Sequence, residues 1–300
     1  MTRVIRYTVP NLATMEQRGS IMTRTKTLLS LNQALSRCAF ELVEVPGDFV
    51  KNASEETRAG LPVGSMLLDR ATAEALYSDE PGDPTAPAAG YILHTEPSLP
   101  RRGTRRVTPA LRWYDRDWVN LFIRQISTIV DCLGRPPYAV ELHPGFSQRG
   151  QNTIMAVADG ICRVHGELSD KYGSPVQVFI ENRTGQVMRT GSQMREMWVC
   201  LTGRHAPLEK VCGFVVDLQQ LYTSTRAQFL SELAEVPAES IAGYHIHRLH
   251  RTPGVDDPIP WREAAGIIAR GWRPLHILPE VHHWEQLLVT YGFCKEVLGL

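Results

Sequence analysis

The sequence reads VQVFIENRTGQ from Val176 to Gln186, an apolar run that ends in a carboxylate, an amide and a glycine turn. A continuous apolar run of this length, closed by turn residues, is typical of a buried parallel strand. A carboxylate such as that of Glu181 is costly to bury unless it is paired or bound to a metal ion. We therefore expect a polar site at the end of this strand.

The same pattern of strand followed by helix recurs along the chain. Further strands are predicted at 5–9, 40–45, 91–94, 138–143, 211–217, 241–247 and 275–280, and helices at 25–38, 66–77, 115–133, 151–172, 193–202, 225–234, 261–269 and 284–298. This alternation requires parallel strands joined by crossover helices, and eight repeats in about 250 or more residues favour a closed β/α barrel. Because no linker divides the chain, we predict a (β/α)8 TIM barrel that spans residues 1–300 as a single domain. An open doubly wound sheet is less favoured, because no glycine-rich phosphate turn follows the first strand.

Composition limits the classes of protein to consider. The 300 residues contain 32 Lys and Arg and 32 Asp and Glu, so no net charge indicates a nucleic-acid partner. The six cysteines are scattered without paired spacing, which argues against a disulfide framework and favours a reducing cytoplasmic location. No apolar run has the length of a signal peptide core or a membrane span, so no membrane partner is expected.

Metal-ligating side chains end most of the predicted strands. In a β/α barrel the active site forms at the carboxyl ends of the strands, where these side chains would converge. Any one of them alone could be a satisfied polar residue, but six at equivalent points favour a site for one or two divalent ions, zinc or manganese. The predicted ligands are His94, His143, Glu181, Asp217, either His245 or His247, and Glu280.

These motifs resemble the xylose isomerase-like barrels and, among them, endonuclease IV (AP endonuclease family 2). The resemblance rests on His94, the turn His143-Pro-Gly, the motif Glu181-Asn-Arg-Thr-Gly-Gln186, Gly213-Phe-Val-Val-Asp217, Gly243-Tyr-His-Ile-His247 and Leu278-Pro-Glu280. It covers roughly residues 4–298. It implies that Glu181 bridges two ions, with His94 and His143 on one and Asp217, His247 and Glu280 on the other. The implied activity is metal-assisted hydrolysis of a phosphoester, with damaged DNA as a candidate partner.

The sequence departs from endonuclease IV where that family builds a third metal site. Gln220 stands where the family has a histidine, and the Asp-x-His pair after the seventh strand has no clear counterpart. His250 and Asp256 could substitute for them, but nothing in the sequence directs them to the cluster. We therefore predict one or two ions rather than three.

The same superfamily contains sugar isomerases and epimerases that use a single ion, and this gives an alternative prediction. Their ligand set would be met by Glu181, Asp217, His247 and Glu280, with Glu181 and Glu280 as the catalytic proton-transfer groups beside a metal-polarised carbonyl. The ligands alone do not separate hydrolysis from isomerisation. A barrel kept only for binding is disfavoured, because it should have lost its ligands piecemeal.

Substrate recognition is assigned to residues beside the predicted cluster. Asn182, Arg248, His250 and Arg251 are candidate substrate-binding residues, and the arginines favour an anionic or sugar-like small molecule. The loop arginines Arg101, Arg102, Arg105 and Arg106 either track a phosphate backbone or form a solvated surface. His282 and His283 either orient ligands or lie on the surface at a helix start. The oligomeric state stays open.

Overall fold

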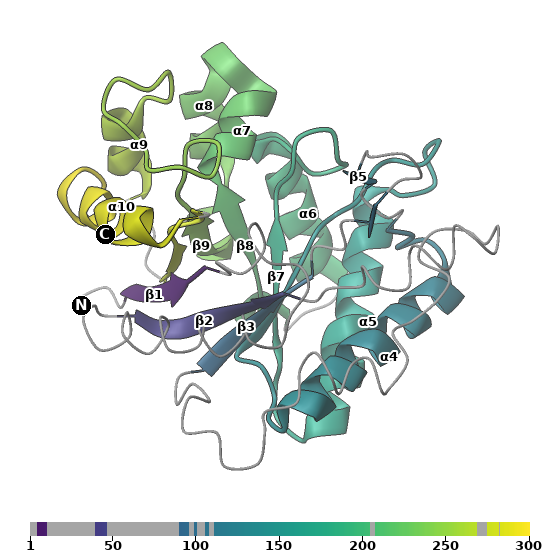
Figure 1. The fold of residues 1–300 in the computed structure, drawn as a ribbon. Helices are drawn as coiled ribbons and strands as arrows, with labels where there is room; N and C mark the ends of the chain where they lie inside the picture. The colour runs from purple at the N-terminus through teal and green to yellow at the C-terminus, as the bar shows by residue number, and fades with distance from the viewer. Residues whose placement is uncertain are drawn as a thin grey trace.

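A closed barrel forms the centre of the molecule in the computed structural model, which describes residues 5–10, 40–46, 90–95, 99–100, 106–107, 111–204, 208–268, 275–281 and 283–300. Within these ranges, eight parallel strands form the barrel in the order β1-β10-β9-β8-β7-β6-β3-β2 (Figure 1). The pairing of β1 (Ile5–Val9) with β10 (Leu275–Leu278) closes the circle. The predicted (β/α)8 fold is confirmed.

The other barrel strands lie close to their predicted positions. They are β2 (Phe40–Pro46), β3 (Gly90–His94), β6 (Ala139–Leu142), β7 (Gln177–Glu181), β8 (Cys212–Asp217) and β9 (Ile241–His245). A short antiparallel pair, β4 (Leu99–Pro100) with β5 (Arg106–Val107), follows β3. Four strands end at a predicted ligand, β3 at His94, β7 at Glu181, β8 at Asp217 and β9 at His245. His247, the other candidate, lies two residues beyond β9. In the pairing of β8 with β9, His245 lies opposite Asp217.

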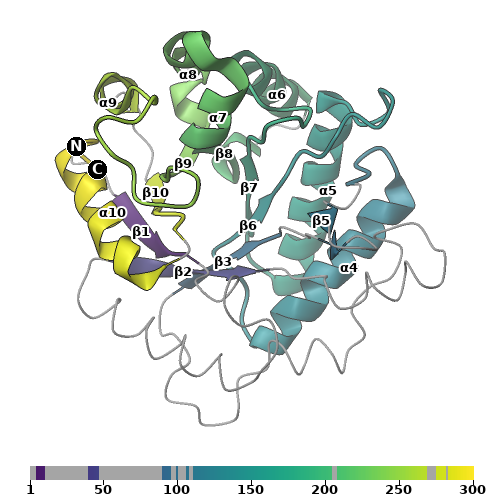
Figure 2. The same cartoon turned by 45° about the horizontal axis from the view of Figure 1, so that its top comes forward.

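The described helices lie against the outside of the barrel over part of its circumference (Figure 2). Their apolar faces and the outward faces of the strands form the main core, with Ile126, Ile161, Leu168 and Met197 among its fully buried members. The helices are α4 (Arg116–Leu133), α5 (Ile154–Tyr172), α6 (Gly191–Arg204), α7 (Leu218–Thr225), α8 (Phe229–Glu235), α9 (Trp261–Ile268) and α10 (Trp284–Glu296). None of these described helices is long and apolar enough to cross a membrane.

Helix ends follow from local sequence. The Asp115 carboxylate accepts hydrogen bonds from the first turn of α4, and the Thr153 hydroxyl does the same for α5. Each of these helices ends at a left-handed glycine, Gly134 or Gly173. The single helix predicted at 225–234 is wrong in extent. Asp217 itself caps α7 at the end of β8, so helical structure begins there, and α8 follows after a break.

The inside of the barrel is built in layers, as alternation along the strands requires. One layer is apolar and consists of Leu42, Ile92, Ala139, Phe179, Val215 and Ala242. Two residues further along, the inward positions of β2, β3, β6, β7 and β8 hold Glu44, His94, Glu141, Glu181 and Asp217, all largely or fully buried. The barrel therefore changes from an apolar to an ionisable interior at its carboxyl end.

Several expectations lie outside the described residues. These are the helices at 25–38 and 66–77, the side chains of the loop arginines, and His282.

Candidate metal centre

The carboxyl ends of seven barrel strands bring nine ionisable side chains into one cluster, counted over the described part of the chain. Glu280 is the most exposed of them, with 17% of its side chain accessible, and Glu44 follows with 10%. The remaining members are 5% exposed or less. The cluster consists of Glu44, His94, Glu141, His143, Glu181, Asp217, His245, His247 and Glu280.

One group of ligand atoms forms around Glu181, His94 and His143. The Oε2 atom of Glu181 lies 3.3 Å from His94 Nε2 and 3.4 Å from His143 Nδ1. His94 Nε2 is also 3.2 Å from His143 Nε2. The three residues offer one atom each within 4.8 Å of the others. The structure thus brings together the three residues expected on a first ion.

A second group forms around Glu280, Asp217 and the two histidines of β9 and its extension. His247 Nε2 is 3.0 Å from Glu280 Oε2 and 3.2 Å from Asp217 Oδ2. His245 Nδ1 lies 3.5 Å from Glu280 Oε2 and 3.6 Å from Glu181 Oε1. His245 therefore lies between the two groups, and the residues expected on a second ion are also neighbours.

The charges of the cluster do not cancel. Five carboxyl groups face four imidazoles, so without a bound cation protons on the cluster must offset the repulsion between the buried carboxylates. Burial opposes protonation of an imidazole, but the carboxylates of Glu141 and Glu181 raise the pKa of both His94 and His245 well above the ordinary value. Burial likewise opposes ionisation of Glu181 and Glu280, yet nearby imidazoles lower the pKa of both carboxyls well below the usual range.

Burial and neighbouring charges also compete in setting the pKa values of His247 and Asp217. Burial would lower the pKa of His247, but Asp217 and Glu280 raise it to about 10. Burial raises the pKa of Asp217, and the charges of Glu181 and Glu280 add to this against the opposing effect of His247. A divalent cation would replace the protons that these imidazoles otherwise hold.

The spacing of the donor atoms fits a metal ion. Two ligands that each lie about 2.1 Å from one tetrahedral ion are about 3.4 Å apart. The gaps from Glu181 to His94 and His143, and from His245 to Glu181 and Glu280, are 3.3 to 3.6 Å. His245 Nδ1 is buried and makes no hydrogen bond within the described residues. The carboxylate oxygens of Glu181 and Glu280 lie 3.6 and 3.5 Å from this nitrogen. An ion between the nitrogen and these oxygens could bind all three atoms. The residues present therefore fit a divalent metal.

The proposed third-site residues have different surroundings. The side chain of Gln220 binds the loop after β7, because its oxygen accepts a hydrogen bond from the backbone N–H of Thr184 at 3.2 Å. His250 does approach the cluster: its ring stacks on His247 and its Nδ1 lies 3.6 Å from Glu280 Oε1. The backbone N–H of His250 donates to His247 Nδ1 at 2.9 Å. His250 is thus fixed near the cluster by this short turn.

The predicted substrate-binding residues divide into two kinds. Asn182 is fully buried, and its amide binds the backbone of Asp217 in both directions, at 2.8 and 3.1 Å. Arg248 donates to Gln219 at 3.0 Å, and its backbone pairs with that of Arg251, whose side chain is exposed. Asn182 therefore holds Asp217 in place, whereas Arg248 is half-buried beside Gln219 and Arg251 is exposed.

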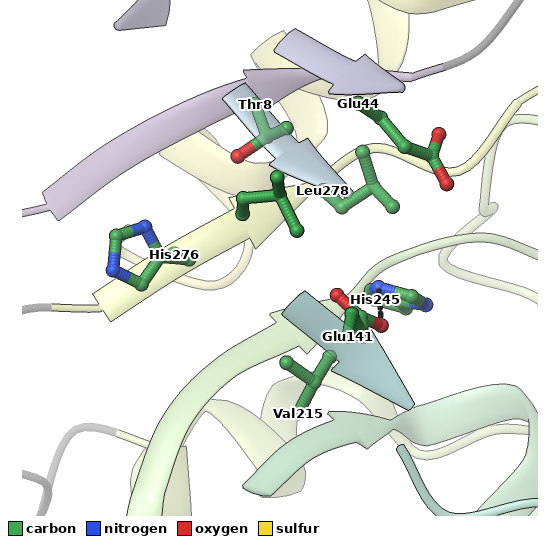
Figure 3. A pocket seen from close by; sticks show the side chains of 8 residues that line it. Thr8, Glu44, Glu141, Val215, His245, His276 and Leu278 are labelled. Carbon is green, nitrogen blue, oxygen red and sulfur yellow. Dashed lines mark ion pairs between the residues drawn. The ribbon is translucent and has the colours of Figure 1, made fainter. Parts of the chain in front are cut away.

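Two buried carboxylates were missed by reading only the strand ends. Glu44 lies 2.5 Å from His94 Nδ1, and Glu141 lies 2.9 Å from His245 Nε2. Both line a small cavity inside the barrel, and Figure 3 shows them with His245 at one side and His276 at the opposite end. Their signal was present in the sequence, since Glu141 stands two residues before His143 and so faces the same side of its strand.

Comparison with known proteins shows what the barrel is similar to. No protein-family model matches the sequence, and no curated protein matches it either. Among solved structures, a D-psicose 3-epimerase from Clostridium cellulolyticum H10 with D-tagatose has 9% identity and a TM-score of 0.60, covering 98% of this chain and 99% of that one. A D-allulose 3-epimerase from Methylomonas sp. has 12% identity, a TM-score of 0.61 and 99% coverage of both chains. The IolI protein with a bound zinc atom has 11% identity, a TM-score of 0.57 and 98% coverage of both.

At these identities the likeness shows the fold alone, a (β/α)8 barrel. The expected superfamily resemblance is confirmed at this level. The named structures are two sugar epimerases and a protein with a bound zinc atom. The narrower resemblance to endonuclease IV stays a prediction from the sequence motifs.

Proposed function

We propose that this protein is a divalent-metal-dependent isomerase or epimerase of a sugar or sugar phosphate. The observation that carries the proposal is the placement of Glu181 and Glu280. These carboxylates come from different strands and approach the same atom, His245 Nδ1, at 3.6 and 3.5 Å. Two carboxylates facing one small space can act on opposite faces of a single carbon atom.

The chemistry follows from these two groups. One carboxylate removes a proton from the carbon next to the substrate carbonyl, and the other delivers a proton to that carbon or to its neighbour. Delivery to the opposite face of the same carbon gives epimerisation, whereas delivery to the neighbouring carbon gives isomerisation. A divalent ion held here would polarise the substrate carbonyl and make the adjacent proton easier to remove.

The ligands assigned to this ion are Glu181, Asp217, His245 and Glu280. His94, His143 and the shared Glu181 form a second set. Asn182 positions Asp217 through its backbone, and we assign Arg248 and Arg251 to an anionic part of the substrate, such as a phosphate. The similarity to sugar epimerases of the same fold supports a polyhydroxylated substrate.

Phosphoester hydrolysis is the second candidate function, and a specific observation favours it. The group formed by His94, His143 and Glu181 could hold a further ion, which one-metal proton transfer does not need. A second ion beside the first is the usual arrangement for clamping a phosphoester during in-line displacement. Damaged DNA would be the substrate on this reading.

The test measures proton exchange directly. Purified protein loaded with Mn²⁺, Co²⁺ or Zn²⁺ is incubated in D2O with a panel of ketoses, aldoses and their phosphates. We expect deuterium to appear at the carbon next to the carbonyl, seen by NMR. Glu280→Gln should reduce this exchange at least 100-fold, because the amide cannot transfer the proton. The matched control is Glu285→Gln, an exposed glutamate at the start of α10, which should exchange at the wild-type rate.

The same preparations are assayed on duplex DNA with an abasic site and on simple phosphoesters. Cleavage there, without deuterium uptake from any sugar, would reject the isomerase and support the hydrolase.

A further inference from the structure

We propose that Glu44 and Glu141 are positioning residues that orient His94 and His245 and decide which ring nitrogen of each faces the metal centre. This inference deepens the proposed function and rests on its metal requirement. Neither glutamate ends a strand, and neither belongs to the ligand sets above.

The first pair joins β2 to β3. Glu44 Oε1 is 2.5 Å from His94 Nδ1, and the His94 ring is 5% exposed. The opposite ring nitrogen, Nε2, faces Glu181 at 3.3 Å and His143 at 3.2 Å. When the carboxylate accepts the N–H of Nδ1, the lone pair of the neutral ring is left on Nε2. His94 is thereby held ready to ligate through Nε2.

The second pair joins β6 to β9 and uses the opposite nitrogen. Glu141 Oε1 is 2.9 Å from His245 Nε2, as the dashed line in Figure 3 marks. His245 Nδ1 then carries the lone pair, and it faces Glu181 and Glu280 at 3.6 and 3.5 Å. Two histidines that look equivalent in sequence are therefore predicted to ligate through different nitrogens.

Both carboxylates also line the interior cavity, together with the apolar side chains of Ile92, Val215 and Leu278. An ionised carboxylate among apolar groups needs a charged or N–H partner, and each finds an imidazole. Glu141 also lies within 4.8 Å of Glu181 and His245, so direct ligation of an ion by Glu141 is the rival arrangement.

Carboxylates that hold ligating histidines raise the basicity of the ring as well as fixing its tautomer, and their loss commonly weakens metal binding 10- to 100-fold. The effect should be specific to position. Glu44→Gln should act on an ion beside His94, and Glu141→Gln on an ion beside His245. The amide keeps the size of the side chain but removes its charge.

The experiment measures metal affinity and ring tautomers without substrate. Zn²⁺ and Co²⁺ are titrated into metal-free wild type, Glu44→Gln, Glu141→Gln and the control His276→Gln, which changes a buried ring in the same cavity. We expect Kd to rise about 10- to 100-fold in the two glutamate variants and to stay unchanged in the control. In Zn²⁺-loaded protein labelled with ¹⁵N-histidine, NMR should show N–H at Nδ1 of His94 and at Nε2 of His245, and these proton signals should shift upfield in the matching variants.

Unchanged Kd values in both glutamate variants, or the opposite tautomers in the wild type, would overturn the inference. So would anomalous scattering that places an ion directly on Glu141. Its failure is separable from that of the proposed function, because metal binding and tautomers are read without any sugar. Wild-type protein that binds metal with the expected tautomers but exchanges no sugar proton would reject only the proposed function.

Discussion

His245, the last residue of β9, and His247, two residues further on, differ in which ring nitrogen is available. His247 Nδ1 accepts a backbone N–H from His250 at 2.9 Å, so its neutral ring carries the proton on Nε2, the atom that faces Asp217 and Glu280. His245 has the reverse arrangement, because Glu141 is next to Nε2 and Nδ1 faces the cluster. A ring nitrogen that carries a proton cannot ligate a metal. His245 is therefore the better ligand, although the sequence motif favours His247.

Alanine substitutions should separate the two histidines. We expect His245→Ala to weaken Zn²⁺ binding more than 10-fold beyond His247→Ala, because only the former removes a lone pair from the site. Competitive titration with a chromogenic chelator measures both affinities. An equal or larger loss in His247→Ala would assign ligation to His247, as the sequence resemblance implies.

The buried ring of His276 predicts an acid sensitivity unrelated to the metal. Burial, together with the charge of Arg6, lowers its pKa from 6.5 to about 3. The unfolded chain therefore binds a proton between these values that the folded protein does not, so this residue costs stability as pH falls below 6.5. Relative to His276→Gln, the wild type should lose about 1.4 kcal/mol of unfolding free energy per pH unit from pH 6 to pH 4. Urea denaturation at each pH measures this, and parallel profiles would contradict it.

The two-residue alternation of inward-facing side chains along a strand predicts the positions of Glu44 and Glu141, which the strand ends alone do not. Glu44 and Glu141 follow the apolar inward residues Leu42 and Ala139 by two positions, which places them inside the barrel. The tautomers of His245 and His247 could not be read in this way. They depend on Glu141 from a distant strand and on a backbone turn at His250, and both contacts exist only in the folded chain.

At the scale of elements, one close contact connects the outer helices to the metal centre. The indole N–H of Trp113 donates to the backbone oxygen of His143 at 3.1 Å. The ring fits there because α5 has Gly160 at the contact, where an added Cβ atom would lie 2.4 Å from the indole. Gly160 therefore lets Trp113 hold the end of β6, which carries His143.

Two glycines of the same helix provide a matched test. Gly160→Ala should destabilise the protein by about 1–3 kcal/mol through overpacking against Trp113. Gly166→Ala, where a Cβ atom meets nothing within 4 Å, should be neutral or stabilise it by up to about 1 kcal/mol. Chemical denaturation measures both, and equal effects of the two substitutions would show that the contact is unimportant.

The strands were easier to predict than the helices. The strand at 5–9 has its predicted bounds, because Pro10 follows it directly. The strand in the opening stretch differs by little from its prediction, because a long apolar run leaves few alternatives. α7 was missed because it begins immediately after β8, with Asp217 ending the strand and capping the helix at once. When one residue both ends a strand and caps the next helix, no loop in the sequence marks where the helix begins.

At the scale of the whole molecule, metal binding should be linked to the stability of the fold. The site residues are buried together only in the folded barrel, so an ion that binds them selects the folded state. At a free metal concentration of about 100 times Kd, each ion should add about 2.7 kcal/mol to the unfolding free energy. Thermal denaturation with Zn²⁺ or Mn²⁺, compared with excess chelator, should show a raised Tm. A Tm indifferent to both would contradict a native metal site.

The arrangement of the ligands around the barrel also has a consequence for how quickly the site forms. Its members come from seven strands, beginning at Glu44 and ending at Glu280, and the last strand must pair with the first before the circle closes. Contacts this far apart in the chain form slowly, because loop-closure entropy must be overcome first. During refolding, secondary structure should therefore appear well before any ion is captured. The onset of Co²⁺ absorption would then time the closure of the barrel.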